Sequence, residues 1–477
     1  MKNDNLFELI NSLNKSERRD FVLYSKKYKG DKKYLLLFHE LCNGKNNQSL
    51  DITNINYERH RLYNQIQKCF SKNYDSNESS SRFLQTFLFI KFLLNKRLLE
   101  LVKKEIINLK KACYNSGKYN ELNIIIDFEI LNGRFWGNTL SNTLRLINEK
   151  KVTQKIINNI HFLENIAYNL FDIMAQIGTP INENEINLFH NTYNNISSLN
   201  INEFQSETEK LYYYRVSFFY YTVTNNFENA FNAGTKVFSI YKKNKYFISE
   251  FINQYVSLLH QLIYIKAFDD IVYASKFLEE LKKTKKQKKY SLFVCNDIDA
   301  TIKSSEIAIL FWTNKHKQVI DNEKDYYRYF TFQLSDIPLN RVNAYAYFIA
   351  QSAFLCKEYE IAKKWIELIL KNKHNKLYFS VYFYTLIMLI LTRINEEKYD
   401  VAELEYVRCK NYLISKKQKR ISFEFQILKI INILLLSNNI KSIDLARKCN
   451  YLNIKENIIS NIKHPKFLIK WLDEKVN

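Results

Sequence analysis

Residues 344–370 have the sequence AYAYFIAQSAFLCKEYEIAKKWIELIL, and this stretch decides the fold. It predicts two amphipathic helices joined by a polar corner at Lys357 and Glu358, because apolar residues recur three and four positions apart on either side. Small residues such as Ala350 and Ala362 let two helix backbones pack closely. A lone helical hairpin leaves such an apolar face uncovered and needs stacked neighbours. The stretch therefore predicts one unit of a helical array.

The corner of this unit recurs along the chain. It consists of an aromatic residue, an acidic residue, any residue and then a small or branched apolar residue. Copies begin at Phe227, Phe268, Tyr359 and Tyr399, with a weaker copy around Tyr119 and a later one around Asn439. Several intervals between copies are about 40 residues, the length of a two-helix repeat. We therefore expect an all-α protein built as an α-solenoid of antiparallel helix pairs.

These units resemble tetratricopeptide repeats. One copy matches the aromatic and small positions of that family at Tyr214, Tyr221, Phe227 and Ala230, and another matches it at Ile349, Ala350, Tyr359, Ala362 and Ile366. The chain departs from the family at Lys357, which replaces the corner glycine, and at Ala346 and Ala353, where large aromatic residues are usual. No proline closes the unit, and the spacing exceeds the family's usual length of about 34 residues.

The resemblance implies that an extended peptide binds the concave face formed by the first helices of the units. Carried over position by position, it nominates Tyr212, Arg215 and Phe219 in one unit and Tyr347, Gln351 and Phe354 in another. Tyrosine suits recognition because it combines an apolar body with a polar tip. The alternative is that these side chains pack between neighbouring repeats.

Two breaks predict the domain organisation. The low-complexity run at 73–81 and the Gly-Thr-Pro sequence at 178–180 divide the chain into three regions. We expect residues 1–75 to form a small N-terminal helical domain or cap, and residues 76–178 to form a first helical-hairpin region. Residues 179–477 are expected to hold tetratricopeptide-like repeats that end in a C-terminal capping helix containing Trp471.

The opening of the chain resembles an uncharacterised family of helical-repeat proteins common in the Bacteroidota. The match lies in residues 12–19, SLNKSERR, and residues 30–34, GDKKY. The family implies a helical architecture and no established activity. A helix-turn-helix reader of DNA is the alternative for this region, with phosphate contacts from Arg18, Arg19, Lys26 and Lys27.

The composition supports helices throughout. Seven glycines and three prolines are far fewer than sheets and their turns require, and 46% of the residues are hydrophobic. The first residues lack a cleavable signal pattern, and the longest apolar run, 377–392, is too short for a membrane span. Seven scattered cysteines fit reduced thiols. We therefore expect a cytoplasmic protein.

The formal net charge of +22 has two explanations. One is a nucleic-acid or other polyanion partner, contacted by Lys282, Lys283, Lys285 and Lys286 together with Lys416, Lys417 and Arg420. The other is a low-GC genome, which enriches lysine, asparagine and isoleucine together. The densest lysine run also fits a solvated loop between helix pairs.

Catalytic chemistry has little support in the sequence. Phosphate-binding glycine loops, zinc-protease motifs and nucleophile elbows are all lacking. His39 and Cys42 are too few ligands for structural zinc, which takes about four. We predict no enzyme activity, no metal and no cofactor. The leading hypothesis is a scaffold that binds a protein or peptide partner, and the alternative is a nucleic-acid-binding solenoid with lysine edges and base-stacking tyrosines.

Overall fold

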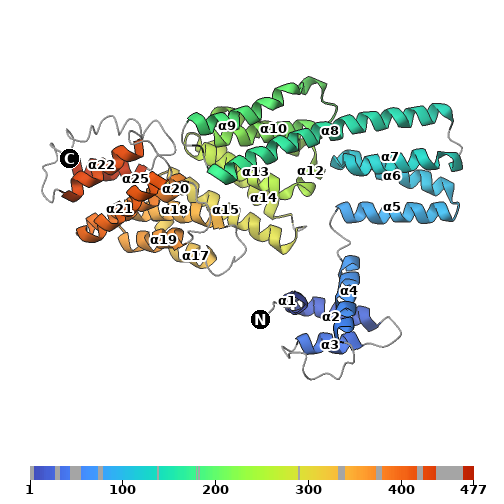
Figure 1. Ribbon diagram of the computed structural model, residues 1–477, viewed down its shortest axis with the longest axis horizontal. Coiled ribbons are helices and arrows are strands. Elements are labelled where there is room, and N and C mark those ends of the chain that lie inside the picture. Colours follow the sequence, from blue (N-terminus) through green and yellow to red (C-terminus); the bar gives the residue numbers. More distant parts are fainter. Residues whose placement is uncertain are drawn as a thin grey trace. The chain divides into compact units, whose positions relative to one another are not determined.

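The computed structural model describes residues 5–26, 33–42, 55–73, 79–136, 139–178, 180, 183–287, 290–330, 339–371, 379–415, 423–436 and 466–476 (Figure 1). Within these ranges the elements are helices and no strand occurs. The prediction of an all-α protein is therefore confirmed. Scarcity of glycine and proline explains it, because few positions interrupt the helices.

The chain divides into two compact units. The first comprises residues 1–113 and 124–146, and the second comprises residues 114–123 and 147–477. The division thus falls inside long helices rather than at a loop. The predicted regions 1–75, 76–178 and 179–477 stay predictions.

The first unit begins with four helices around their own core. They are α1 (Asn5–Ser12), α2 (Lys15–Lys26), α3 (Lys33–Cys42) and α4 (Ile55–Asn73). Ile10, Phe21, Leu37 and Leu62 from the four helices are fully buried in one apolar cluster. Rings of Phe21 and Phe38 lie 4.6 Å apart. This local core explains why a small helical region forms at the start of the chain.

The junction between α1 and α2 is fixed by reciprocal capping. The backbone N–H of Asn14 donates to the Glu17 carboxylate at 2.8 Å, and the backbone N–H of Glu17 donates to Asn14 Oδ1 at 3.0 Å. The Arg18 guanidinium donates to the carbonyl oxygens of Leu13 and Ile10 at the end of α1. The Arg18 side chain, nominated as a phosphate contact, therefore donates hydrogen bonds to the backbone at the C-terminal end of α1. Lys27 lies outside the described residues.

Three further helices belong wholly or largely to this unit. They are α5 (Ser79–Asn95), α6 (Leu99–Ser116) and α7 (Tyr119–Asn132), followed by a 3-10 turn at Gly133–Trp136. The rings of Phe87 and Phe128 join α5 to α7 at 5.3 Å, and Lys110 pairs with Glu129 at 3.1 Å. Each helix therefore has a partner within the unit.

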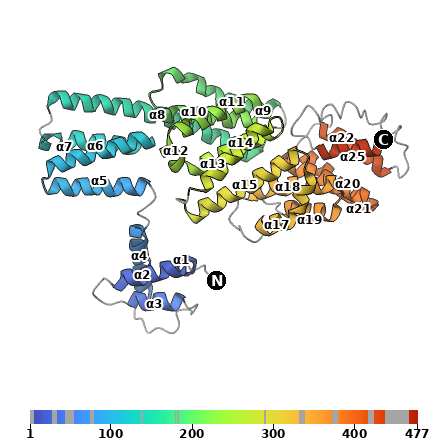
Figure 2. The ribbon, with the colours of Figure 1, turned by 180° about the vertical axis from the view of Figure 1, so that it is seen from behind.

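The second unit contains most of the helix pairs (Figure 2). Its first half has α8 (Leu140–Ile177, which begins in the first unit), α9 (Glu183–Asn194), α10 (Glu207–Val223), α11 (Phe227–Lys243), α12 (Lys245–Glu250), α13 (Ile252–Ala267) and α14 (Ile271–Lys285), with 3-10 turns at Asn195–Ser198 and Ile201–Glu203. Its second half has α15 (Leu292–Trp312), α16 (His316–Asp321), α17 (Glu323–Arg328), α18 (Leu339–Leu355), α19 (Tyr359–Lys371), α20 (Phe379–Asn395), α21 (Tyr399–Ser415), α22 (Phe423–Leu436) and α25 (Lys466–Val476).

Consecutive helices of this unit pack as hairpins. The pairs α10 with α11, α13 with α14, α18 with α19 and α20 with α21 make the densest contacts. Neighbouring pairs also touch through α11 with α13, α15 with α18, α19 with α20 and α21 with α22. The helix pair predicted from residues 344–370 is therefore present as α18 and α19.

Most of the hairpin corners share one backbone geometry. A residue with positive φ stands two positions before the second helix at Arg97, Gly117, Asn225, Asn314, Lys357 and Glu397, with φ between 55° and 72°. After Arg97, Asn225, Asn314, Lys357 and Glu397, the next backbone N–H donates to a carbonyl five residues earlier. Examples are the bonds from Glu358 to Ala353 at 2.9 Å and from Lys398 to Arg393 at 2.9 Å. This bond is the mark of a Schellman helix end. The corner at Lys357 thus keeps the geometry that glycine usually supplies.

One position beyond each corner is always buried. The residue three places after the start of the second helix is Val102, Leu122, Ala230, Ala274, Val319, Ala362 or Ala402, and each has 0% of its surface exposed. A side chain at that point meets the preceding helix at its closest approach, so small or branched residues fit. Close packing of the two helices therefore explains why the predicted corner pattern ends in a small or branched apolar residue.

The copy predicted to begin at Phe268 is in the wrong register. The helix α14 begins at Ile271, and its buried small residue is Ala274. Asp270 caps α14 by accepting from the backbone N–H of Tyr273 at 3.2 Å, while the exposed Phe268 ring contacts Trp312 at 5.2 Å. The aromatic residue therefore precedes the corner here instead of opening the helix. The copy around Asn439 lies outside the described residues.

Candidate helix-binding surface

The helix α20 is buried on every side. Residues 383–392 are buried without interruption, and the helix contacts α18, α19 and α21. A helix that is apolar all round requires neighbours all round. The apolar run 377–392, too short for a membrane span, thus contributes the centre of a core. Among the described residues, no helix is long and apolar enough to cross a membrane.

The apolar cluster that contains α20 also includes side chains of α25, the last described helix of the chain. Figures 1 and 2 both place α25 beside α22. Phe467, Leu468, Trp471 and Leu472 lie on one side of α25 and have at most 3% of their surface exposed. These positions follow the spacing i, i+1, i+4 and i+5, which places them on one helix face. The face of α25 that carries its apolar side chains therefore packs wholly against the array.

Three helices receive these side chains. The Phe467 ring lies 5.4 Å from the ring of Phe354 on α18. Leu468, Trp471 and Leu472 line a small hollow shared with α22, whose side chains there are Ile427, Ile430 and Ile431. We call the receiving surface the α25 seat and define it by Phe354, Leu355, Lys357, Tyr359, Asn395, Ile427, Ile430 and Ile431.

Polar contacts fix the position of α25 on the seat. Trp471 Nε1 donates to Asn395 Oδ1 at 3.2 Å, and Asn395 Nδ2 donates to the Tyr359 hydroxyl at 3.1 Å. The Trp471 indole is thus held at the end of α20 and, through Asn395, at the start of α19. A tryptophan that buries its ring and satisfies its N–H is a typical anchor in helix recognition.

Two further contacts lie at the corner between α18 and α19. Lys470 Nζ donates to the backbone carbonyl of Leu355 at 3.4 Å. Lys357 pairs with Glu474 at 3.4 Å, with 64% and 44% of these side chains exposed. An ion pair this exposed adds little affinity, on the order of 0–1 kcal/mol, but it favours one orientation of the bound helix.

Of the residues nominated on α18, Gln351 and Phe354 are buried and Tyr347 is half-buried. Phe354 belongs to the seat and is covered by α25, while Gln351 has 2% of its surface exposed. Burial, with a contribution from Tyr264 of α13, raises the pKa of Tyr347 well above its ordinary value. Within the described residues, neither the Tyr347 hydroxyl nor Gln351 Oε1 has a hydrogen-bond partner. Of the three, Phe354 is the one that lines the α25 seat.

The residues nominated on α10 lie against α8. The Arg215 guanidinium stands over the Tyr212 ring at 5.4 Å, and the Phe219 ring lies 4.2 Å from Phe171 of α8. Burial, together with the nearby carboxylate of Glu164, raises the pKa of Tyr212 to about 12. The structure therefore brings these three residues together in a half-buried contact with α8. Their role in peptide binding stays a prediction.

The predicted polyanion contacts divide into two groups. Lys282 pairs with Glu306 at 3.1 Å, and Lys285 pairs with Asp299 at 2.6 Å, both across to α15. Lys283 and Lys286 are exposed. The other three nominated residues, Lys416, Lys417 and Arg420, lie outside the described residues.

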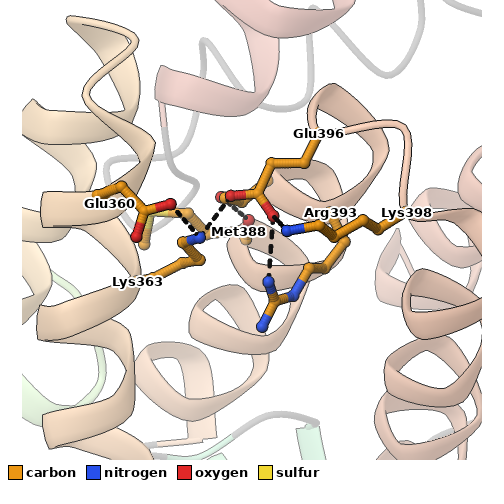
Figure 3. Close-up of polar contacts among 7 residues, drawn as sticks. Glu360, Lys363, Met388, Arg393, Glu396 and Lys398 are labelled. Atoms are coloured by element: carbon orange, nitrogen blue, oxygen red, sulfur yellow. Dashed lines mark hydrogen bonds and ion pairs between the residues drawn. The ribbon is translucent and has the colours of Figure 1, made fainter.

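The corner between α20 and α21 holds an ion cluster that was not predicted from the sequence. Figure 3 shows the Glu396 carboxylate between Lys363 of α19, Arg393 and Lys398. Only 14% of the Glu396 side chain is exposed. Burial alone would raise the pKa of Glu396, but hydrogen bonds from Lys363, Lys398 and Arg393 outweigh it and lower that pKa to about 2.

This cluster joins α19 to the end of α20, next to the Asn395 of the seat. Lys363 also pairs with Glu360, so one ammonium group links a carboxylate of α19 to a carboxylate in the corner that follows α20 (Figure 3). The sequence signal that would have found it is the Arg393–Glu396 spacing of three, which brings the two side chains to one side of α20. The cluster therefore helps to position the two helices relative to each other.

The described residues contain no group of three or more His, Cys, Asp or Glu side chains able to hold a metal ion. The six cysteines within the described ranges form no disulfide with one another. Burial raises the pKa of the Cys409 thiol, which disfavours its reactive thiolate form.

Comparison with known proteins adds no family. No family model, no curated protein and no solved structure matches the chain. The likenesses to tetratricopeptide repeats and to the Bacteroidota helical-repeat family therefore stay predictions that depend on the residues quoted above.

Proposed function

We propose that this chain is a non-enzymatic, tetratricopeptide-like α-solenoid of the cytoplasm that binds a helical segment of a partner protein. Stacking of successive hairpins supports the solenoid, because neighbouring pairs contact one another and most pairs repeat the same corner followed by a buried residue. The absence of disulfides among the described cysteines supports a reducing compartment.

The α25 seat is the observation that carries the protein-binding role. A short amphipathic helix, separated from α22 by residues 437–465, inserts one apolar face and a hydrogen-bonded tryptophan into a surface made by three other helices. This arrangement is the helix-in-groove mode of recognition. Phe354 and Asn395 provide an aromatic contact and a polar contact of the kind that dominates binding energy.

Ion pairing supports a protein partner over a nucleic acid. Lys282 and Lys285 lie in the densest lysine run, and acids of α15 neutralise both. A phosphate backbone would have to compete with those carboxylates. Because charge neutralisation supplies most non-specific nucleic-acid affinity, this part of the basic surface is a poor site for it.

Affinity capture from the native host, after nuclease treatment, tests the proposal. We expect partner proteins to stay bound after nuclease treatment and between about 50 and 200 mM salt, because apolar contacts depend weakly on ionic strength. Replacing Phe354 with Ala removes an aromatic contact of the seat and should reduce capture, whereas replacing the 72% exposed Leu404 with Ala should not. Binding that disappears with nuclease or with salt would contradict the proposal.

A further inference from the structure

The seat is already filled by the chain itself, and this restricts what a partner can be. A partner helix can reach Phe354, Asn395 and Ile430 only after α25 leaves. Resting on the proposed function, we propose that α25 occupies the seat in place of the partner helix, and that the partner is an amphipathic helix repeating the chemistry of α25.

The buried face of α25 shows which apolar side chains a partner helix needs. The seat accepts an aromatic ring at position i, against Phe354, and an indole at i+4, beside Asn395. It accepts aliphatic side chains at i+1 and i+5 against Ile427, Ile430 and Ile431. An extended peptide would place these groups on alternate faces, so the seat selects a helix.

The polar contacts of the seat fix the direction in which a bound helix runs. The indole N–H of a bound helix has to donate to Asn395 Oδ1. Burying that N–H without an acceptor would cost more free energy than the hydrogen bond contributes. A cation at i+3 reaches the Leu355 carbonyl, and an acid at i+7 reaches Lys357. Both lie on the same side of the seat, at the corner between α18 and α19. A helix of reversed direction would lose the indole bond and place its acid away from Lys357.

Covalent attachment sets how strongly α25 competes. A segment tethered to its own site acts at an effective concentration on the order of 1 mM. A free helix at about 10 µM with equal intrinsic affinity would therefore occupy the seat about a hundredfold less often than α25 does. Weakening α25 alone should raise the apparent affinity for an added helix, although the seat itself is unchanged.

The test uses the full-length chain and a fluorescein-labelled peptide of residues 464–477. We expect the peptide to bind the Trp471→Ala chain at least tenfold more tightly than the unmodified chain, measured by fluorescence anisotropy. A peptide carrying Trp471→Ala should bind neither chain. The Leu404→Ala chain, altered at an exposed position of α21, should behave like the unmodified chain.

A second variant distinguishes release of α25 from unfolding of the chain. Phe467→Ala removes a different anchor from α25 and should also raise peptide affinity, provided that the circular dichroism spectrum is unchanged. Equal peptide affinity for the unmodified chain and both variants would overturn the inference, while partner capture through Phe354 could still support the proposed function. Concentration-dependent dimers that exchange α25 would also overturn it, since the occupant would then be a second copy.

Discussion

Replacing Glu397 with Gly should make the protein more stable. Glu397 has φ of 60° at the corner between α20 and α21 and is exposed. A left-handed backbone costs a residue with a Cβ about 1–2 kcal/mol, and glycine avoids that cost. Glycine loses more conformational entropy on folding, which offsets about 0.5–1 kcal/mol. The expected net gain is therefore about 0.5–1 kcal/mol in the free energy of unfolding.

The matched control is Glu397→Ala, which removes the same exposed side chain but keeps the Cβ. It should change the free energy of unfolding by less than about 0.5 kcal/mol. Urea unfolding followed by tryptophan fluorescence is the assay, because Trp312, Trp365 and Trp471 belong to or pack against the core that this corner joins. A glycine variant no more stable than the alanine variant would refute a left-handed corner. Asn225→Gly should gain less, since asparagine tolerates this conformation.

Three further substitutions test the packing and the charges. Ala362→Leu should destabilise the chain by roughly 1–3 kcal/mol, because Ala362 is fully buried at a close helix contact; unchanged urea unfolding would mean that the repeat register is wrong. Glu396→Gln should cost about 1–2 kcal/mol at pH 7, after allowance for screening, since the carboxylate pKa is about 2 in the fold against 4.5 when unperturbed. That difference should shrink as the pH falls from 4.5 towards 2, and a constant difference in unfolding midpoint would contradict the ion cluster. Glu209→Ala should cost about 2–4 kcal/mol, because the buried carboxylate accepts from the Ser206 backbone at 2.9 Å and from Asn159 at 2.7 Å; thermal unfolding close to that of the unmodified protein would exclude this role.

Local features of the fold could be predicted from the sequence. Tyr359 and Tyr399 each open the second helix of a pair, each is half-buried, and each follows a corner of the same geometry. The residues that form such a corner lie within one or two helical turns of one another. A short stretch of sequence therefore contains the whole pattern. The register failed at Phe268 because that corner lacks the left-handed residue and is capped by Asp270 instead.

Contacts between distant segments could not be predicted. A closing helix with Trp471 was expected, but its position on Phe354, Asn395 and Ile430 depends on three helices that meet only in the folded chain. The same holds for Glu396, because its partner Lys363 belongs to another helix and comes beside it only in the folded chain. Helical periodicity identifies an apolar face but not what covers it.

Hydrogen exchange of α25 in the full-length chain most directly tests whether the array binds a helix at the seat. Amides in Lys466–Val476 should exchange at least about 100-fold more slowly than those of the isolated peptide, because docking on Phe354 and Asn395 protects them. Protection should fall in the Trp471→Ala chain and stay unchanged in the Leu404→Ala chain. Exchange of α25 at the rate of the free peptide would contradict the helix-binding surface.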